Sequence, residues 1–362
     1  KWVRLWYEKI VRGIEERTYT YSQKHADRAI RFIEAFCHHC EGALAPGLVV
    51  LELWQKAFLS VVFGVLDKKG NRQFREVLLE IGRKNGKTLL AAGIALYLSY
   101  LDGEYGAKVY FCAPKLDQAR LCFDAYHQMI LSEVELSGMA RKRRTDIYIA
   151  DTNSSAQPLA FNAKKSDGLN PHLAVCDELA ARQGEAGLKQ YEVLKSALGA
   201  RRQPLILCIT TAGYVNDGIF DEMIRRSTAV LLGTSEEARL APVLYTIDDI
   251  DKWDDINELR KANPNLGVSV SVDYMLEEIA VARGSLSKKV EFLVKYCNVK
   301  QNSSSAWLDA QTVGKAFAGK RYSLDDFRDT YAVGGIDLSR TTDLTACVLM
   351  VERAGVIYTF AR

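Results

Sequence analysis

The chain has 362 residues, a length that suits two or three domains. Its 48 Lys and Arg residues nearly balance its 45 Asp and Glu residues, which leaves a formal net charge of +3. This balance excludes a uniformly basic nucleic-acid coat protein and an acidic disordered chain, but it permits a local basic patch. The mean hydropathy is −0.10 and no apolar run reaches the ~18 residues of a membrane span, so we expect no membrane partner.

The two ends and the cysteines bear on the cellular setting. The first residues lack the apolar segment and cleavage site of a signal peptide. The chain begins without Met and ends at Arg362 directly after a strand-like run, so we expect the natural protein to be longer. Four of the eight cysteines lie in apolar, strand-like runs, which favours reduced thiols and an intracellular protein. These four are Cys112, Cys176, Cys208 and Cys347.

The segment Cys37-His38-His39-Cys40 has the residue types of a zinc site. Structural zinc sites usually combine two separated ligand pairs, whereas these four residues fall within one expected helical turn. We therefore expect no zinc to bind here.

In chain order, residues 1–60 are expected to be helical, because apolar residues recur at three- and four-residue steps over 27–40 and 51–63. From about residue 75, short apolar runs alternate with helical patterns. This alternation predicts an α/β fold over 61–242, in which helices flank a parallel sheet. The expected strands are 77–81, 109–112, 173–176 and 205–209, and the expected helices are 87–100, 116–131, 188–198 and 218–232.

After about Pro242 this alternation ends. Helical segments at 255–262, 272–283 and 288–298 predict a small helical linker domain over 243–305, which ends in a polar stretch suited to a hinge. Strand-like runs at 331–337, 344–351 and 356–360 predict a β meander, the start of a further domain over 306–362.

The segment from Ile81 to Thr88 carries the strongest chemical signal. It follows an expected strand and opens an expected helix, which is the setting in which backbone N–H groups of a P-loop bind phosphate. Ile81 replaces the usual first glycine, and Arg83 adds a charge that ordinary P-loops lack. The alternative is a basic turn that caps a helix. The residues expected to bind ATP are Gly82, Lys84, Asn85, Gly86, Lys87 and Thr88, where Lys87 and Arg83 neutralise phosphate charge and Thr88 binds Mg²⁺.

Two further strand ends carry matching chemistry. Asp177 and Glu178 follow the run 173–176, at the edge of a parallel sheet where ligands bind. We expect Asp177 to bind Mg²⁺ and Glu178 to orient and deprotonate the attacking water. Thr210 and Thr211 follow the next run and are placed to sense hydrolysis. Alone, the acidic pair is equally typical of a helix cap, and the threonines of an ST-turn.

Together these motifs resemble the large terminase subunit of tailed bacteriophages, the motor that packages DNA into procapsids, over nearly the whole chain. Residues 83–88 look like the family's deviant Walker A motif. Residues 168–171 leading to Asp177-Glu178 look like its Walker B motif, and residues 210–213 like its coupling motif. Residues 113–119 and 261–267 are similar to two further family segments, the second of them the linker signature.

The resemblance implies further roles. Gln55, beside Trp54, would read the adenine base, although a surface amide beside a core aromatic is an even alternative. A ring motor needs an arginine that reaches a neighbour's γ-phosphate; Arg201 and Arg202 are the candidates, and Arg83 is a candidate within its own subunit. Solvated surface arginine is the competing interpretation for each.

The resemblance also implies an RNase H-like nuclease domain, of which the meander would be the opening. Such a domain binds two divalent metals, Mg²⁺ or Mn²⁺, through about three carboxylates. Asp337 matches the first ligand position, and Asp343 is a second candidate that also suits a turn. The later acidic residues would lie beyond Arg362, so we expect an incomplete nuclease site in this chain.

The resulting hypothesis is an ATP-hydrolysing motor that moves double-stranded DNA. The resemblance implies a homo-oligomeric ring on the portal protein of the procapsid, a small terminase subunit as partner, and a location in the cytoplasm of the infected bacterium. The basic runs 141–144 and 164–165 are candidate DNA contacts, with a solvated face as the alternative. Two other functions remain open: a helicase-like translocase, for which 241–305 looks too small to be a second motor domain, and a nuclease that uses the ATPase fold as a DNA platform.

Overall fold

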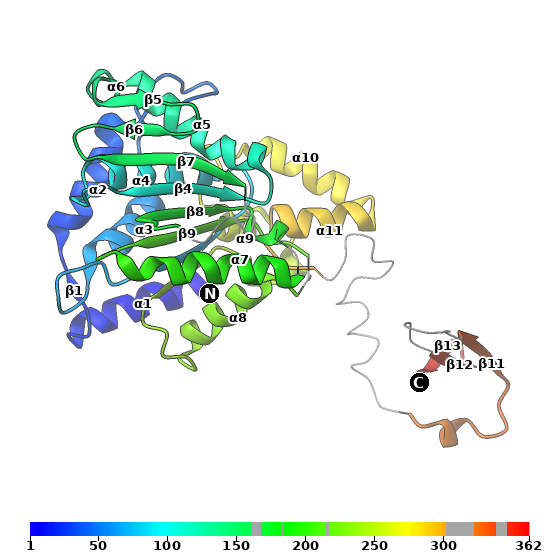
Figure 1. Ribbon diagram of the computed structural model, residues 1–362. Helices are drawn as coiled ribbons and strands as arrows, with labels where there is room; N and C mark the ends of the chain where they lie inside the picture. The colour runs from blue at the N-terminus through cyan, green and yellow to red at the C-terminus, as the bar shows by residue number, and fades with distance from the viewer. Residues whose placement is uncertain (161–167, 183, 215–216, 302–321, 338–345, 362) are drawn as a thin grey trace. The chain divides into compact units, whose positions relative to one another are not determined.

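The computed structural model describes residues 1–160, 168–182, 184–214, 217–301, 322–337 and 346–361. The chain forms two compact units, Lys1–Trp307 and Leu308–Arg362. The first unit contains the α/β domain and the helical linker domain, and the second contains the β meander (Figure 1). None of the described helices is both long and apolar enough to cross a lipid bilayer.

The first unit is built on an eight-stranded sheet in the order β10-β3-β9-β8-β4-β7-β6-β5. Neighbours from β10 to β7 pair in parallel, and β6 and β5 continue the sheet with antiparallel pairing. The strands are β3 (Glu76–Glu80), β4 (Lys108–Ala113), β5 (Ala140–Lys142), β6 (Ile147–Ile149), β7 (Ser154–Ala160), β8 (Leu173–Asp177), β9 (Leu205–Thr210) and β10 (Leu240–Leu244). The predicted parallel sheet is present at the centre. The sequence patterns miss β5, β6, β7 and β10, and β5 and β6 are too short for a period of two to stand out.

Helices cover both faces of this sheet (Figure 1). On one face lie α4 and α5, with α2 packed against α4; on the other lie α7 and α8, with α1 against α8 and β10. The helices are α1 (Trp2–Glu15), α2 (Gln23–Phe36), α3 (Leu53–Gly64), α4 (Lys87–Tyr100), α5 (Leu116–Ser132), α6 (Val134–Met139), α7 (Gly184–Ala197) and α8 (Ile219–Leu232). A small antiparallel pair, β1 (Thr20–Tyr21) and β2 (Val65–Leu66), joins the start of the chain to the end of α3.

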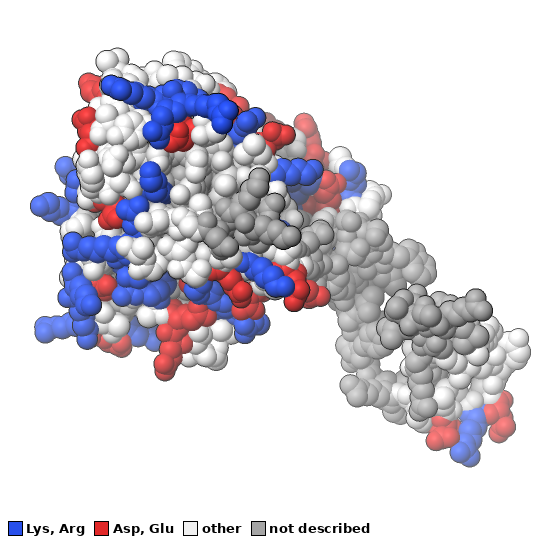
Figure 2. Space-filling model, in the orientation of Figure 1, with Lys and Arg blue, Asp and Glu red and all other residues white. Residues whose placement is uncertain are grey.

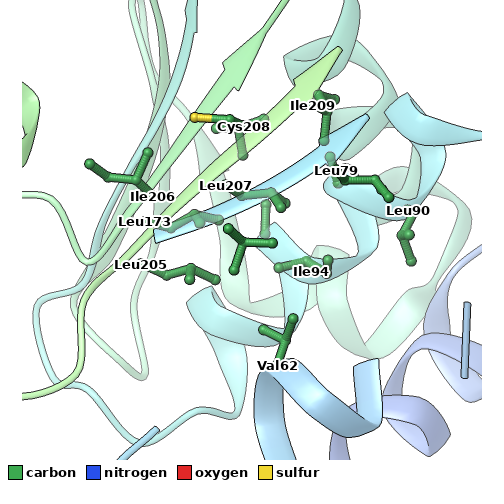
Figure 3. Close-up of a cluster of buried hydrophobic side chains, with 14 of the residues drawn as sticks. Val62, Leu79, Leu90, Ile94, Leu173, Leu205, Ile206, Leu207, Cys208 and Ile209 are labelled. Carbon is green, nitrogen blue, oxygen red and sulfur yellow. The ribbon is translucent and has the colours of Figure 1, made fainter. Parts of the chain in front are cut away.

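Side chains of the central strands alternate between the two helical layers. On β9, Leu205 and Leu207 lie toward Ile94 of α4, whereas Ile206 and Cys208 lie on the opposite face (Figure 3). All five are at most 1% exposed. Burial on both faces explains why the strands read as continuous apolar runs. Full burial of one such aliphatic side chain stabilises the fold by about 1.5–3 kcal/mol.

The linker domain has a hydrophobic core of its own. Its helices α9 (Ile256–Ala262), α10 (Val272–Arg283) and α11 (Leu286–Lys295) enclose Trp253, Met275 and Phe292. The rings of Trp253 and Phe292 meet edge-on, with centroids 5.5 Å apart. The prediction of three helices in this region is confirmed, with the last one beginning earlier and ending at Lys295.

The second unit contains an antiparallel meander of β11 (Ala332–Asp337), β12 (Ala346–Arg353) and β13 (Val356–Ala361). A 3₁₀ helix, Leu324–Phe327, places Phe327 against the rings of Tyr358 and Phe360. The predicted order of three strands is confirmed.

A buried charged network lies at the amino ends of the central strands. Arg72 donates hydrogen bonds to Asp102 and to the carbonyl oxygen of Gln203, and His172, directly before β8, contacts the same carboxylate at 2.7 Å. The side chains of Arg72, Asp102 and His172 are 3%, 5% and 0% exposed. Such a pair offsets its loss of hydration only while both partners are present. The network therefore ties the segments before β3, β4, β8 and β9 together.

Replacing Asp102 by Ala should lower the free energy of unfolding by about 3 kcal/mol or more, because the Arg72 charge is then buried and unpaired. Burial raises the pKa of Asp102, but Arg72 and His172 together hold it below its ordinary value. The stabilisation is therefore present above about pH 4 and is lost as the pH falls further. Urea unfolding at several pH values measures both effects. Asp151→Ala, in an exposed turn, is the control, and an equal loss in both variants would contradict this account.

Candidate active site

The carboxyl ends of β3, β8 and β9 bring three loops to one edge of the sheet. This follows from parallel pairing, because the carboxyl ends of neighbouring parallel strands lie at the same edge. The loops line a cavity of about 860 Å³, and α11 of the linker domain contributes to its lining. The polar lining residues are Arg83, Lys84, Lys87, Thr88, Asp177, Glu178, Thr210, Thr211, Tyr214, Ser287, Lys288, Glu291 and Lys295.

The loop between β3 and α4 has the strand-to-helix setting that the sequence predicts. Gly86 caps α4 with a φ of +76°, and Lys84 also has a positive φ, of 64°. A residue with a Cβ adopts this conformation only at an energetic cost, so the loop is held in shape by its surroundings. Among the described residues, the backbone N–H groups of Asn85 and Gly86 donate to no protein acceptor. They suit an anion at the N-terminus of α4.

The ammonium group of Lys87 connects this loop to β9. It donates to the carbonyl oxygens of Ile81 and Gly82, both at 2.9 Å, and to Thr211 Oγ1 at 3.0 Å. Burial lowers the pKa of Lys87 to about 8, while Asp177 favours the charged form. The expected phosphate-binding lysine and one expected sensor threonine are therefore in direct contact.

The two carboxylates after β8 have different environments. Asp177 Oδ1 accepts the backbone N–H of Glu178 at 2.8 Å, and burial raises the pKa of Asp177 to about 6. Glu178 has a φ of +50° and an exposed side chain, which Gln118 Nε2 contacts at 2.7 Å. Positive φ in a residue other than glycine often marks a functional constraint. Asp177 is thus the enclosed carboxylate, and Glu178 is the one that solvent reaches.

Gln118 is a site residue whose role no sequence pattern indicated. It lies in the first turn of α5, directly after β4. Because β4 pairs with β8, this turn lies beside the segment that follows β8 and carries Glu178. The sequence contains the residue within a family-like segment, but only the strand order brings it to the carboxylate.

The threonines after β9 contact both neighbouring loops. Thr210 Oγ1 accepts the backbone N–H of Ala180 at 3.2 Å and donates to the carbonyl oxygen of Thr211 at 2.8 Å. Ala180 belongs to the turn that follows Glu178. One threonine therefore joins β9 to the carboxylate turn, and the other joins it to Lys87.

Two P-loop residues face the linker domain rather than the cavity. Asn85 is fully buried, and its side chain bonds to Asn263 and Asn265. A Cβ added at Gly82 would lie 2.1 Å from Asn263 Oδ1. The linker therefore occupies the space beside Gly82 and binds the Asn85 side chain. Binding of the nucleotide by Gly82 and Asn85 stays a prediction.

Gln55 and Trp54 lie at the start of α3, beside the P-loop. Gln55 is 4% exposed; its Oε1 accepts the backbone N–H of Glu52 at 2.8 Å, and its Nε2 lies near Gly86. Trp54 Nε1 donates to Asn265 Oδ1 at 2.5 Å. Trp54 is therefore more than a core aromatic, and recognition of adenine by Gln55 stays a prediction.

The three candidate arginines lie at different places. Arg201 and Arg202 precede β9, so they lie at the opposite end of the strands from the cavity. Arg201 pairs with Glu104 at 2.9 Å, and Arg202 donates to Asn71 at 2.7 Å. The structure does not bring either of them to the phosphate loop of its own chain, whereas Arg83 lines the cavity.

The remaining candidates from the sequence are the two basic runs and the two acidic residues Asp337 and Asp343. The basic run 141–144 lies on β5 and the following turn, where Lys and Arg side chains gather at the sheet edge (Figure 2). Lys142 lies 4.9 Å from the ring of Phe123, and Arg143 pairs with Asp146. Residues 164–165 and Asp343 lie outside the described residues. Asp337 ends β11, with its backbone opposite Ala346.

The segment Cys37-His38-His39-Cys40 follows α2. Cys37 is buried, and the His38 ring bonds to the carbonyl oxygen of Pro46 at 2.7 Å and to Glu133 at 3.0 Å. Across the part of the chain that the structure describes, no three His, Cys, Asp or Glu side chains form a group able to hold a metal ion.

Two family models match the chain. Terminase large subunit, ATPase domain, matches residues 53–228, and terminase large subunit, endonuclease domain, matches residues 243–362. The first range contains all three loops of the cavity, and the second begins at the linker domain. The chain belongs to the family of terminase large subunits.

Three individual proteins show the extent of the similarity. The chain is 31% identical over 190 residues to protein YmfN of Escherichia coli strain K12, which is 52% of this chain and 41% of that protein. It is 24% identical over 377 aligned positions to the terminase large subunit of Lactococcus phage p2, covering 99% of this chain and 66% of that protein. The crystal structure of the HK97 bacteriophage large terminase has the same fold, with a TM-score of 0.66 at 24% identity over 93% of this chain and 67% of that one. The chain thus spans about two thirds of these terminase subunits.

Glu80, the last residue of β3, is a buried carboxyl group that no sequence motif indicated. It is 5% exposed, and burial raises its pKa to about 8, although Lys300 and Lys87 favour the ionised form. A carboxyl group with a raised pKa keeps its proton in the folded chain at pH values where the unfolded chain has lost it. Glu80 therefore makes the fold less stable as the pH rises from about 4 to about 8.

Replacing Glu80 by Gln should raise the free energy of unfolding at pH 8 by on the order of 2 kcal/mol, because the amide needs no proton to stay neutral. At pH 5 the two proteins should differ much less, since both carry a neutral side chain when folded. Urea unfolding at both pH values measures this difference. Glu277→Gln, on the exposed side of α10, is the matched control. A difference that does not grow with pH would argue against the assignment.

Proposed function

We propose that this chain supplies the ATP-hydrolysing motor of a bacteriophage DNA-packaging machine, acting on double-stranded DNA. The observation that carries the proposal is the convergence of Lys87, the Asp177-Glu178 pair and Thr211 on one cavity of about 860 Å³. Phosphoryl transfer needs positioned cations, a metal-binding acid and a base for water, and these residue types supply all three. Membership of the terminase family supports the link to packaging.

In this proposal the P-loop binds the triphosphate with the free N–H groups at the start of α4, and Lys87 and Arg83 neutralise its charge. Glu178 orients the attacking water and accepts its proton. Gln118 holds the carboxylate of Glu178 in place through its amide N–H. Thr210 and Thr211 relay the state of the site, because they contact the carboxylate turn and Lys87.

Thr88 and Asp177 fit a magnesium ion. Both line the cavity, and hydroxyl and carboxylate oxygens are ligands that Mg²⁺ prefers. Burial raises the pKa of Asp177 although Lys87 and Arg182 favour its ionised form, and a bound cation would favour that form further. The metal would neutralise charge on the phosphate oxygens.

The proposal extends to parts of the machine beyond this cavity. It includes a homo-oligomeric ring docked on the portal protein, a small terminase subunit as partner, and the cytoplasm of the infected bacterium as location. Gln55 would contact adenine, and Arg201 or Arg202 would act on a neighbouring subunit. Asp337 and Asp343 would belong to a nuclease site for two divalent metals, Mg²⁺ or Mn²⁺.

Hydrolysis of ATP in the presence of Mg²⁺, with and without double-stranded DNA, tests the assignment. Lys87→Ala and Glu178→Gln should each lower kcat by on the order of 100-fold, because the first removes phosphate charge neutralisation and the second removes the base. Glu178→Gln should retain ATP binding, since the carboxylate acts on water rather than on the nucleotide.

The matched controls are Lys189→Ala and Glu185→Gln, which change an exposed pair on α7 at 3.4 Å. Both should hydrolyse ATP at the parent rate. A chain that neither binds nor hydrolyses ATP would refute the proposal, as would unchanged rates in the Lys87 and Glu178 variants.

A further inference from the structure

The linker domain is hydrogen-bonded to the phosphate loop itself. Asn85 Nδ2 donates to Asn263 Oδ1 at 3.0 Å, and Asn85 Oδ1 accepts the backbone N–H of Asn265 at 3.0 Å. These three residues, here named the asparagine clasp, are 0%, 0% and 5% exposed. Water cannot replace a partner that is lost at so buried a site, so each bond matters more than a surface contact.

The clasp also fixes the course of the loop. Asn85 Nδ2 is within hydrogen-bond distance of the carbonyl oxygens of Gly82 and Arg83, at 3.1 and 3.0 Å. From the linker, Ser269 Oγ donates to the carbonyl oxygen of Lys84 at 2.7 Å. The first half of the loop is therefore folded around one buried amide that the linker holds.

Two backbone N–H groups of the loop are taken by the linker. Gly82 donates to the carbonyl oxygen of Ala262 at 3.1 Å, and Arg83 donates to that of Lys295 at 3.0 Å. These two groups are unavailable to a phosphate, so a triphosphate must bind to the second half of the loop and the start of α4.

The contact with Asn263 explains why position 82 is a glycine. A Cβ at this position would lie 2.1 Å from Asn263 Oδ1, far inside any normal contact distance. Asn263 cannot move aside easily, because its Nδ2 also donates to the carbonyl oxygens of Leu259 and Tyr296, at 3.0 and 2.6 Å. The absence of a side chain at Gly82 thus makes room for Asn263 of the linker, and not for a phosphate group.

We infer that Asn263 and Asn265 are positioning residues of the nucleotide site, and that the linker domain sets the shape of the P-loop before ATP binds. The inference rests on the ATPase function proposed above. Preorganisation of a binding loop raises affinity, because the ordering cost is met before the ligand arrives. By linkage, ATP must in turn strengthen docking of the linker by the same factor, which couples the nucleotide state to the linker through the P-loop.

A double-substitution experiment at Gly82 and Asn263 tests the inference, with titration of a fluorescent ATP analogue as the readout. Asn263→Ala should weaken binding about 10-fold, the loss expected for a buried hydrogen bond. Gly82→Ala should weaken it at least as much in the parent chain, but far less when Asn263 is already Ala, because the clashing oxygen is gone. Asn257→Ala, exposed on α9, should bind like the parent.

Ser269→Ala is a milder second variant, because Ser269 is exposed and its hydroxyl bonds to Lys84 and Asn265 at the edge of the clasp. It should weaken ATP binding about 3-fold, whereas Ser196→Ala on α7 should not. Parent-like ATP binding by Asn263→Ala, or the same loss from Gly82→Ala in both backgrounds, would overturn the inference. A parent chain that binds no ATP would refute the proposed function instead, so the two failures are distinguishable.

Discussion

The ammonium group of Lys87 imposes the constraint on which the rest of the site depends. A charge enclosed by protein must find acceptors and opposite charge nearby. Lys87 finds them in the carbonyl oxygens of its own loop, in Thr211 and in the field of Asp177. These groups come from the ends of β3, β9 and β8, which are adjacent in the sheet. The strand order therefore supplies the partners that this partly buried lysine needs, and in the proposed function the same lysine binds phosphate.

The two ends of the sheet serve different purposes. At the amino ends, Arg72 and Arg201 are paired within the chain to Asp102 and Glu104. Such pairs hold strands together and have little capacity left for a ligand. At the carboxyl ends, burial displaces the pKa values of the ionisable groups: it lowers the pKa of Lys87 and raises those of Asp177 and Glu80. The backbone there also has positive φ at Lys84 and Glu178. Displaced pKa values and strained backbone together are typical of functional sites.

The linker domain has two roles that are visible in different contacts. Its own core of apolar residues makes it a compact element. Its buried asparagines nevertheless bond to the P-loop, and Asn298 accepts the backbone N–H of Ala212 at 2.6 Å, directly after the two threonines. The linker therefore contacts both loops to which the proposed function assigns a part in hydrolysis. A flexible tether would contact neither loop.

Local patterns determined much of this protein. The strand before Ile81, the helix from Lys87 and the acidic pair after β8 all follow from apolar periodicity and turn chemistry among neighbouring residues, which a sequence displays directly. Tertiary structure alone decided that Gln118 meets Glu178, that Gly82 accommodates Asn263, and that Arg201 lies far from the cavity. The first two relations join residues 60 and 181 positions apart, and the third depends on strand order. No pattern of neighbouring residues encodes such pairings, because they arise only when separate elements pack on one sheet.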